Sequence, residues 1–279
     1  MLKTYLDYPV EVEENNPEGP LLFVLLHGFG ASTFSWHPVT EALAARGHVI
    51  AYDRPGFGVT PLVSRSAKRI DPYSLQGQVE LLGAIIEKEA KGRPVVLIGH
   101  SAGALVATEF VLRQENVAAG LILESPAVWR RPPIPSLVAR LLRLPALESF
   151  GQRLLESFEK AGMRILESSY FDRDKLTAET IAGYRAPMNS PDWKLSLWRF
   201  MTADQSNKVR TNLWRLELPV FVLTGDHDKI VKVEDTLKVT ERIAGHSIYL
   251  VPEAGHLAHE EQPDDFMRVV DRFIAKVVA

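Results

Sequence analysis

Strand-like and helix-like segments alternate along the first 125 residues of the chain. Every residue of the run Leu21–Leu26 is apolar, and further strand-like runs cover 48–52, 94–98 and 121–123. An uninterrupted apolar run is typical of a strand that is buried on both faces, as in a parallel sheet. Since helical segments separate these runs, their order predicts an α/β fold, in which helices flank a mostly parallel sheet on both faces.

The alternation stops near Ser125 and resumes near Leu218. Prolines crowd the first boundary, at 126, 132, 133 and 135, and residues 136–212 are helical in pattern without strand-like runs. The strand pattern returns over 219–223 and 247–251, and residues 263–277 have the apolar spacing of a final helix. We therefore expect an α/β core of residues 1–125 and 216–279, with a helical lid (cap) of residues 126–215 inserted in it. An insert of this length is usually functional.

Residues 99–103 read Gly-His-Ser-Ala-Gly, between a predicted strand and a predicted helix. In this context the pattern G-x-S-x-G has a mechanism, because a sharp strand-to-helix turn holds the serine side chain clear of the sheet. A Cβ at Gly99 or Gly103 would crowd that turn. A serine hydroxyl is a weak nucleophile at neutral pH and needs a base. The pattern predicts Ser101 as a catalytic nucleophile, and the alternative is a glycine-rich packing turn.

Two later strands are followed by residues that can supply the base and the group that orients it. Asp226 and Asp228 follow the strand at 219–223, and His256 follows the strand at 247–251. Parallel strands place their carboxyl ends at one edge of the sheet, where sites form. His256 is therefore predicted as the base. Asp226 and Asp228 are the candidates for the acid.

These motifs resemble those of the α/β-hydrolase superfamily, in its lidded serine esterase-like branch. The resemblance covers nearly the whole chain outside the lid. The nucleophile motif matches at Ser101, the family's G-x-x-D matches residues 225–228 and selects Asp228 over Asp226, and its late G-H matches Gly255-His256. The resemblance implies a catalytic triad of Ser101, His256 and Asp228, in which Asp228 orients the imidazole. Because some members of the family carry the acid after an earlier strand, Glu124, which follows the strand at 121–123, is the alternative acid.

A further motif, H-G-x-G at residues 27–30, follows the first buried strand. In the family, the backbone N–H of the residue after H-G joins that of the residue after the nucleophile to bind the oxyanion of the tetrahedral intermediate. The resemblance implies that Phe29 and Ala102 form this oxyanion hole, and His27 is expected to shape the turn. The loosely matching loop 53–60, where Thr60 replaces the family's serine, is interpreted as structural.

The resemblance also implies the reaction: hydrolysis of a carboxylic ester through an acyl-enzyme intermediate, with no metal and no organic cofactor. The partner would be a small-molecule ester with an apolar acyl group. Lid residues such as Leu141 and Leu142 either wall an acyl pocket or only bury the lid against the core. Trp129 and Trp198 are candidate substrate-binding residues, and the alternative for both is packing within the lid. Nothing in the pattern indicates an oligomeric state.

Other interpretations stay open. The same triad serves C–C bond hydrolases, acyltransferases and cofactor-free peroxidases, and a non-enzymatic ligand receptor can share the fold. A nucleotide-binding oxidoreductase would use Gly28, Gly30 and Asp53, but Thr33 occupies the place of the third glycine in its G-x-G-x-x-G motif. Epoxide hydrolases and haloalkane dehalogenases of the superfamily have an aspartate at the elbow, so Ser101 argues against both.

Charge, cysteine content and apolar segments bear on the partners and the location of the protein. The formal net charge is −3, which does not favour nucleic acid or an anionic membrane surface. The chain contains no cysteine, so it has neither disulfides nor thiol chemistry. Residues 1–7 lack the apolar stretch of a signal peptide, and no segment reaches the ~20 apolar residues of a membrane span. We expect a cytoplasmic protein.

Overall fold

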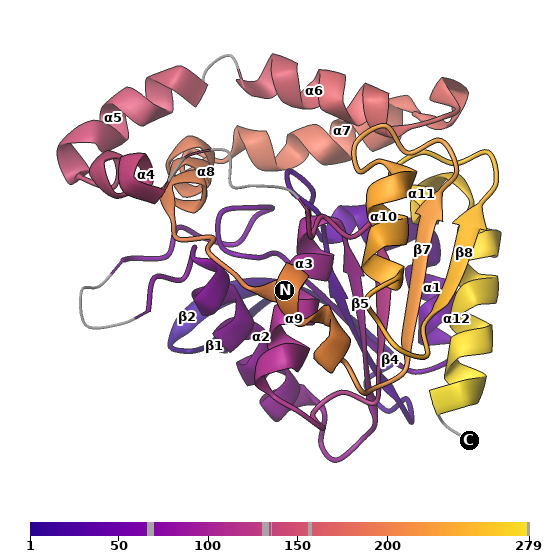
Figure 1. Cartoon of the computed structure of the whole chain (residues 1–279). Helices are drawn as coiled ribbons and strands as arrows, with labels where there is room; N and C mark the ends of the chain where they lie inside the picture. Colours follow the sequence, from indigo (N-terminus) through magenta and orange to yellow (C-terminus); the bar gives the residue numbers. More distant parts are fainter. Residues whose placement is uncertain (66–69, 130–133, 135, 156–157, 278–279) are drawn as a thin grey trace.

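The computed structural model describes residues 1–65, 70–129, 134, 136–155 and 158–277 (Figure 1). Within this part of the chain the strands form one eight-stranded sheet in the order β1-β2-β4-β3-β5-β6-β7-β8. β2 is antiparallel to its neighbours β1 and β4, and all other neighbouring pairs are parallel. The predicted α/β fold with a mostly parallel sheet is thereby confirmed. The strands are β1 (Leu2–Tyr5), β2 (Tyr8–Asn15), β3 (Leu22–Leu26), β4 (His48–Tyr52), β5 (Val95–His100), β6 (Gly120–Glu124), β7 (Val220–Gly225) and β8 (Ser247–Val251).

Helices cover both faces of the sheet, and α2 and α3 lie on the opposite face from α1 and α12. α12 buries the predicted apolar stripe, which includes Phe266, Val270 and Phe273. Ser74 caps α2 by accepting a hydrogen bond from the backbone N–H of Gly77 at 3.0 Å. The core helices are α1 (His37–Ala44), α2 (Leu75–Glu89), α3 (Ala102–Arg113), α10 (Val233–Thr240), α11 (Ala258–Glu261) and α12 (Pro263–Val277).

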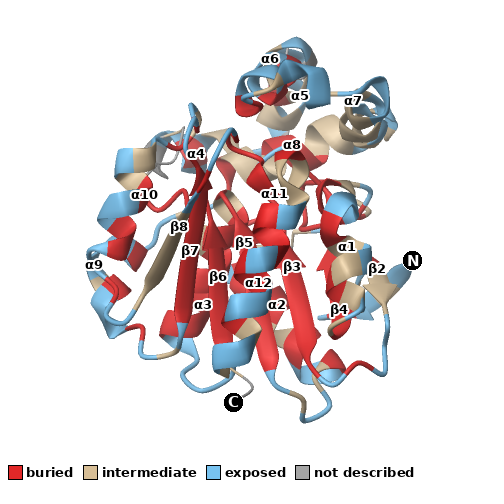
Figure 2. Cartoon of the chain, turned by 90° about the vertical axis from the view of Figure 1, so that its right-hand side faces the viewer, coloured by how far each residue is buried: buried red, intermediate tan, exposed pale blue. Residues whose placement is uncertain are grey.

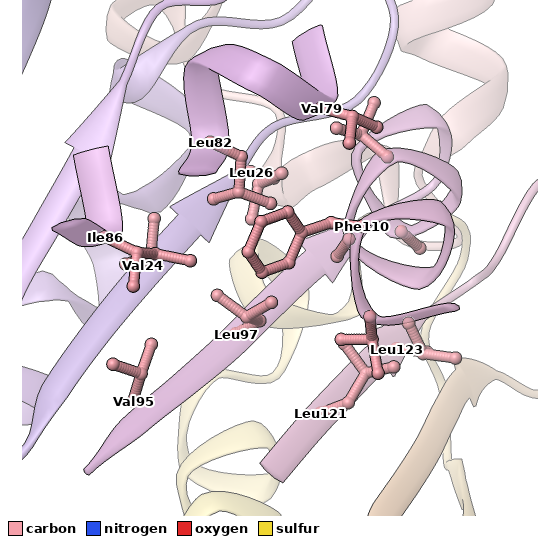
Figure 3. Close-up of a cluster of buried hydrophobic side chains, with 14 of the residues drawn as sticks. Val24, Leu26, Val79, Leu82, Ile86, Val95, Leu97, Phe110, Leu121 and Leu123 are labelled. Atoms are coloured by element: carbon pink, nitrogen blue, oxygen red, sulfur yellow. The ribbon is translucent and has the colours of Figure 1, made fainter. Parts of the chain in front are cut away.

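The central strands are buried along their whole length (Figure 2). Successive side chains of each strand point to opposite faces of the sheet. On one face, Leu26, Leu97 and Leu123 pack with Phe110 of α3 and Leu82 of α2 (Figure 3). The intervening residues of the same strands pack toward α1 and α12. Helices on both faces leave the carboxyl ends of the strands as the place where polar side chains can gather.

Helices connect β6 to β7, and the described residues of this connection include no β-strand. We call residues 126–215 the helical insert. Its α4 to α8 lie over the end of the sheet toward which the arrows of β7 and β8 point (Figure 1). The prolines at 132, 133 and 135, which led us to expect a boundary here, lie outside the described residues. The helices are α4 (Ser136–Leu142), α5 (Pro145–Leu154), α6 (Phe158–Ser169), α7 (Ala178–Arg185), α8 (Trp193–Thr202) and α9 (Val209–Asn212).

The described helices were also compared with the length and apolarity that a bilayer requires. Not one of them combines enough length with enough apolarity to cross a membrane.

Candidate active site

Ser101 occupies a strained turn between β5 and α3. Its φ of 53° and ψ of −112° lie outside the regions that a serine ordinarily adopts. The turn needs glycine on both sides: a Cβ at Gly103 would lie 2.1 Å from the carbonyl oxygen of Leu26, and one at Gly99 would lie 2.6 Å from the Cα of Ala104. This tight packing places Ser101 at the carboxyl edge of the sheet, directly before the first residue of α3.

Asp228 and His256 form a buried pair. His256 Nδ1 lies 2.8 Å from Asp228 Oδ2, and the other carboxylate oxygen accepts the backbone N–H groups of Ile230 and Val231 at 2.8 and 2.9 Å. Burial by itself raises the pKa of Asp228, but the hydrogen bond and charge of His256 and the N–H of Val231 bring that pKa below its ordinary value. The ionised carboxylate therefore accepts a hydrogen bond from the Nδ1–H of His256, which leaves Nε2 free to act as the basic nitrogen.

His100 connects His256 to the turn that contains Ser101. The rings of His100 and His256 lie 4.6 Å apart, and His100 Nε2 lies 3.0 Å from the His256 carbonyl oxygen. Because a carbonyl only accepts, His100 Nε2 donates. Burial lowers the pKa of His100 well below its ordinary value, so its ring is neutral. The catalytic candidates from the loops after β5, β7 and β8 thus gather at one end of the sheet.

The two alternative acids face elsewhere. The side chain of Asp226 is 36% exposed, and its carboxylate lies 3.8 Å from His227 Nε2 rather than against His256. Glu124 is fully buried and forms an ion pair with His259 at 2.7 Å. His259 in turn lies 3.1 Å from the hydroxyl of Ser35. This second, enclosed histidine–acid pair was not anticipated from the sequence, because its members lie 135 residues apart and match no motif.

The H-G-x-G loop lies against the side chain of Ser101. A Cβ at Gly28 would lie 3.4 Å from the Ser101 Cβ and 2.7 Å from His100 Nδ1, so only glycine fits there. Phe29 follows in this loop, and its ring meets Phe57 at 5.5 Å. Ala102 is the first residue of α3, where backbone N–H groups lack acceptors within the helix and the helix dipole is positive. The two N–H groups predicted for the oxyanion hole thus belong to segments that flank the serine.

The two predicted substrate-binding tryptophans differ in their surroundings. Trp198 is 3% exposed, and its ring packs so closely on α5 that a Cβ at Gly151 would lie 2.2 Å from it. That position agrees with the alternative of packing within the insert. Trp129 donates from its indole N–H to the carbonyl of Asp235 at 2.8 Å. It also lines a cavity of about 290 Å³ with Ala127 and Val231. The backbone N–H of Ala127 donates to the carbonyl of Ser101, and that of Val231 donates to the carboxylate of Asp228.

The helical insert is bonded directly to the segment that contains His256. The backbone N–H of His256 donates to the carbonyl of Ser169 at 2.6 Å. Glu261 accepts the N–H of Gly255 at 2.6 Å on one oxygen, and those of Phe171 and Asp172 at 2.8 and 3.0 Å on the other. These contacts were also not anticipated, since Glu261 belongs to no motif considered in the sequence.

Within the described residues, neither Asp53 nor any cluster of metal-ligating side chains is arranged for the nucleotide or metal that it could hold. The Asp53 carboxylate is buried and accepts the backbone N–H groups of Thr33 and Val59, both at 2.7 Å, so it does not face a ribose. Across the described ranges, no group of three or more His, Cys, Asp or Glu side chains is arranged to hold a metal ion.

Known proteins resemble this chain in sequence and in fold. Residues 23–269 match the model of the alpha/beta hydrolase family. An uncharacterized hydrolase, YugF, of Bacillus subtilis is 24% identical over 93% of this chain and 91% of its own length. A pimeloyl-[acyl-carrier protein] methyl ester esterase of Aeromonas salmonicida is 29% identical over 92% of this chain and 96% of its own. Among solved structures, a thermophilic esterase from Thermogutta terrifontis superposes with a TM-score of 0.75 at 22% identity, over 99% of this chain and 98% of that one. Since the family model spans most of the sequence, the chain belongs to the alpha/beta hydrolase family.

Proposed function

We propose that this protein is a serine hydrolase that cleaves carboxylic esters through Ser101, His256 and Asp228. The observation on which this proposal depends is the buried Asp228–His256 pair at 2.8 Å, at the same edge of the sheet as a serine held at a positive φ. A strained strand-to-helix turn holds its serine side chain clear of the sheet, and a histidine oriented by a carboxylate is the base that such a serine requires. Relatives named as esterases support the same conclusion.

The chemistry follows in two halves. Ser101 Oγ attacks the ester carbonyl carbon while His256 Nε2 takes the hydroxyl proton of Ser101. The carbonyl oxygen becomes an oxyanion. The N–H groups of Phe29 and Ala102 would stabilise this charge. The C–O bond to the alcohol then breaks, and His256 gives its proton to the leaving oxygen. In the second half His256 takes a proton from a water, which attacks the carbonyl carbon of the acyl-enzyme. The bond between the acyl carbon and Ser101 Oγ then breaks, His256 returns its proton to Oγ, and the carboxylic acid leaves.

The substrate is proposed to be a small-molecule ester with an apolar acyl group. Exposed apolar side chains on α4 and α5 supply surface for such a group, among them Leu141, Phe150 and Leu154, at 59%, 53% and 55% exposure. The Trp129 cavity, which adjoins backbone groups bonded to Ser101 and Asp228, is the proposed site for one end of the ester. We also propose that residues 126–215 act as a lid over this site.

A series of p-nitrophenyl esters from acetate to long acyl chains tests this function. We expect turnover that peaks at one chain length and disappears in Ser101→Ala, while the exposed Ser206→Ala control keeps wild-type rates. Labelling of Ser101 by a fluorophosphonate without turnover of any ester would assign the triad to another bond, such as a C–C bond. Absence of both turnover and labelling would favour the non-enzymatic receptor.

A further inference from the structure

Arg54 is a buried cation without a carboxylate partner. It is the second residue after the end of β4, and it is 1% exposed. Among the described residues, no acid forms an ion pair with it, and the neighbouring carboxylate of Asp53 binds the N–H groups of Thr33 and Val59 instead. Removing a guanidinium from water is costly unless polar groups replace the water. The polar groups that do so here indicate what Arg54 is for.

Two of those groups are consecutive carbonyls of the H-G-x-G loop. Arg54 Nη2 donates to the carbonyl of His27 at 2.7 Å and to that of Gly28 at 3.0 Å. Nη1 donates to the side chain of Gln78 at 2.6 Å, and the guanidinium carbon lies 5.0 Å from the centre of the Phe57 ring. The charge is therefore placed against the backbone that leads into Phe29.

His27 completes the contacts of the Gly28 carbonyl. Burial and the nearby charge of Arg54 lower the pKa of His27 well below its ordinary value, so the ring is neutral. Its Nε2 accepts the backbone N–H of Arg54 at 3.1 Å, which places the ring proton on Nδ1. Nδ1 lies 2.8 Å from the Gly28 carbonyl oxygen and donates to it. The Gly28 carbonyl thus accepts from both Arg54 and His27.

The Gly28 carbonyl and the Phe29 N–H belong to the same peptide unit. The unit is planar and trans, so its C=O and N–H point in opposite directions. Donors that hold the carbonyl therefore also fix the direction of the N–H. Hydrogen bonds to a carbonyl polarise the amide and make its N–H a stronger donor. A cation behind the carbonyl adds a positive potential at the N–H, and the cation does not need to move during the reaction.

We propose that Arg54 is a positioning residue of the oxyanion site. With His27, its guanidinium holds the Gly28–Phe29 peptide so that the Phe29 N–H faces the developing oxyanion, and its charge strengthens that donor. This inference rests on the proposed serine hydrolase function. In this proposal, loop 53–60, which we interpreted from the sequence as structural, also delivers a charged group to the back of the oxyanion site.

Kinetics of Arg54→Met and Arg54→Lys test the proposal. Loss of an oxyanion donor typically costs ~10²–10³ in rate, so weakening one by Arg54→Met should cost about 10- to 100-fold in kcat, with KM little changed. Arg54→Lys keeps the charge and a donor nitrogen, although not the fork of the guanidinium, and should lose less. Val79→Ala, a buried change one residue from Gln78, controls for general destabilisation and should keep kcat. If Arg54→Met does not fold, the kinetics of Arg54→Lys and its NMR measurement below still decide the question.

An inhibitor pair separates positioning from a merely structural role. A trifluoromethyl ketone that carries the preferred acyl chain binds as an adduct: Ser101 Oγ adds to its carbonyl carbon, the proton passes to His256, and the carbonyl oxygen becomes an oxyanion. The matching methyl ketone binds without that adduct. We expect the inhibition constant of the trifluoromethyl ketone to rise in Arg54→Met by the factor lost in kcat, while that of the methyl ketone stays unchanged. Equal changes in both constants would overturn the proposal.

An NMR measurement examines the peptide directly. The sequence has two Gly-Phe pairs, 28–29 and 56–57, so a protein labelled with carbonyl-¹³C glycine and ¹⁵N phenylalanine gives two correlations. In Arg54→Lys and Arg54→Met, the Gly28 carbonyl resonance should move upfield and the Phe29 amide should shift with it. An unmoved Gly28–Phe29 correlation would contradict the role of Arg54. This result does not depend on whether Ser101 of the wild type is labelled, so it can be told apart from a failure of the proposed function.

Discussion

Glu261 accepts a hydrogen bond from the backbone N–H of Gly255, the residue before His256, at 2.6 Å. The second oxygen of the same carboxylate holds the N–H groups of Phe171 and Asp172 in the helical insert. Glu261 is 2% exposed, and burial raises the pKa of its carboxyl. One side chain therefore fixes both the His256 segment and the insert above it.

Glu261→Gln should lower both stability and kcat. A glutamine presents an NH₂ group where one carboxylate oxygen was, and a backbone N–H cannot accept from it, so a buried donor loses its partner at a cost of about 1–3 kcal/mol. Glu260→Gln is the matched control, because Glu260 is bonded to the hydroxyls of Tyr170 and Tyr184, which can accept as well as donate. Urea denaturation and ester kinetics on both variants measure the difference. Equal effects of the two substitutions would contradict this account.

Asp228→Asn should reduce kcat by about 10⁴-fold, because an amide favours the wrong tautomer of His256. Asp226→Asn, in the same loop, should leave kcat near the wild-type value, because the Asp226 carboxylate faces His227 rather than His256. Steady-state rates with the best ester compare the two variants. If Asp226→Asn or Glu124→Gln proves the more damaging change, Asp228 is not the acid of the triad.

The buried Glu124–His259 pair should act on stability, with a defined pH dependence. Burial alone lowers the pKa of His259, but the charge and hydrogen bond of Glu124 raise it above its ordinary value, with a further contribution from Glu260. Because the pKa of His259 is higher in the folded than in the unfolded protein, protonation of His259 stabilises the fold. This stabilisation is complete at pH values below the unfolded imidazole pKa of about 6.5, and it is lost as the pH rises through the pKa of the folded protein. Breaking a buried pair costs about 3–5 kcal/mol.

Urea denaturation of wild type and Glu124→Gln at pH 6 and pH 9 measures this linkage. The difference in unfolding free energy between the two proteins should be larger at pH 6 than at pH 9. A difference that grows with pH would mean that His259 is neutral in the folded protein.

The sequence allowed the sheet and the catalytic candidates to be predicted because both depend on local patterns. A buried parallel strand is a short apolar run, and the turn at Ser101 needs glycines at fixed offsets. The preference for Asp228 over Asp226 came from the family motif, since both follow the same strand. The direction of Trp198 was not predictable, because it depends on how α5 packs on α8.

The supporting contacts of the site could not be predicted for a different reason. Arg54 meets the carbonyl of Gly28, 26 residues away, and Glu261 meets the N–H of Phe171, 90 residues away. Backbone acceptors and donors have no sequence signature, because every residue has them. Only the fold determines which of them a buried charged side chain will reach.

The central claim is that an acyl group passes through Ser101, and rapid-quench mass spectrometry tests it most directly. Wild-type protein would be mixed with its best p-nitrophenyl ester, quenched in acid within the first turnovers, digested and analysed. The account predicts a mass increase equal to the acyl group on the peptide that contains Ser101, and no such adduct in Ser101→Ala. Release of p-nitrophenol with the acyl group on another residue would contradict it.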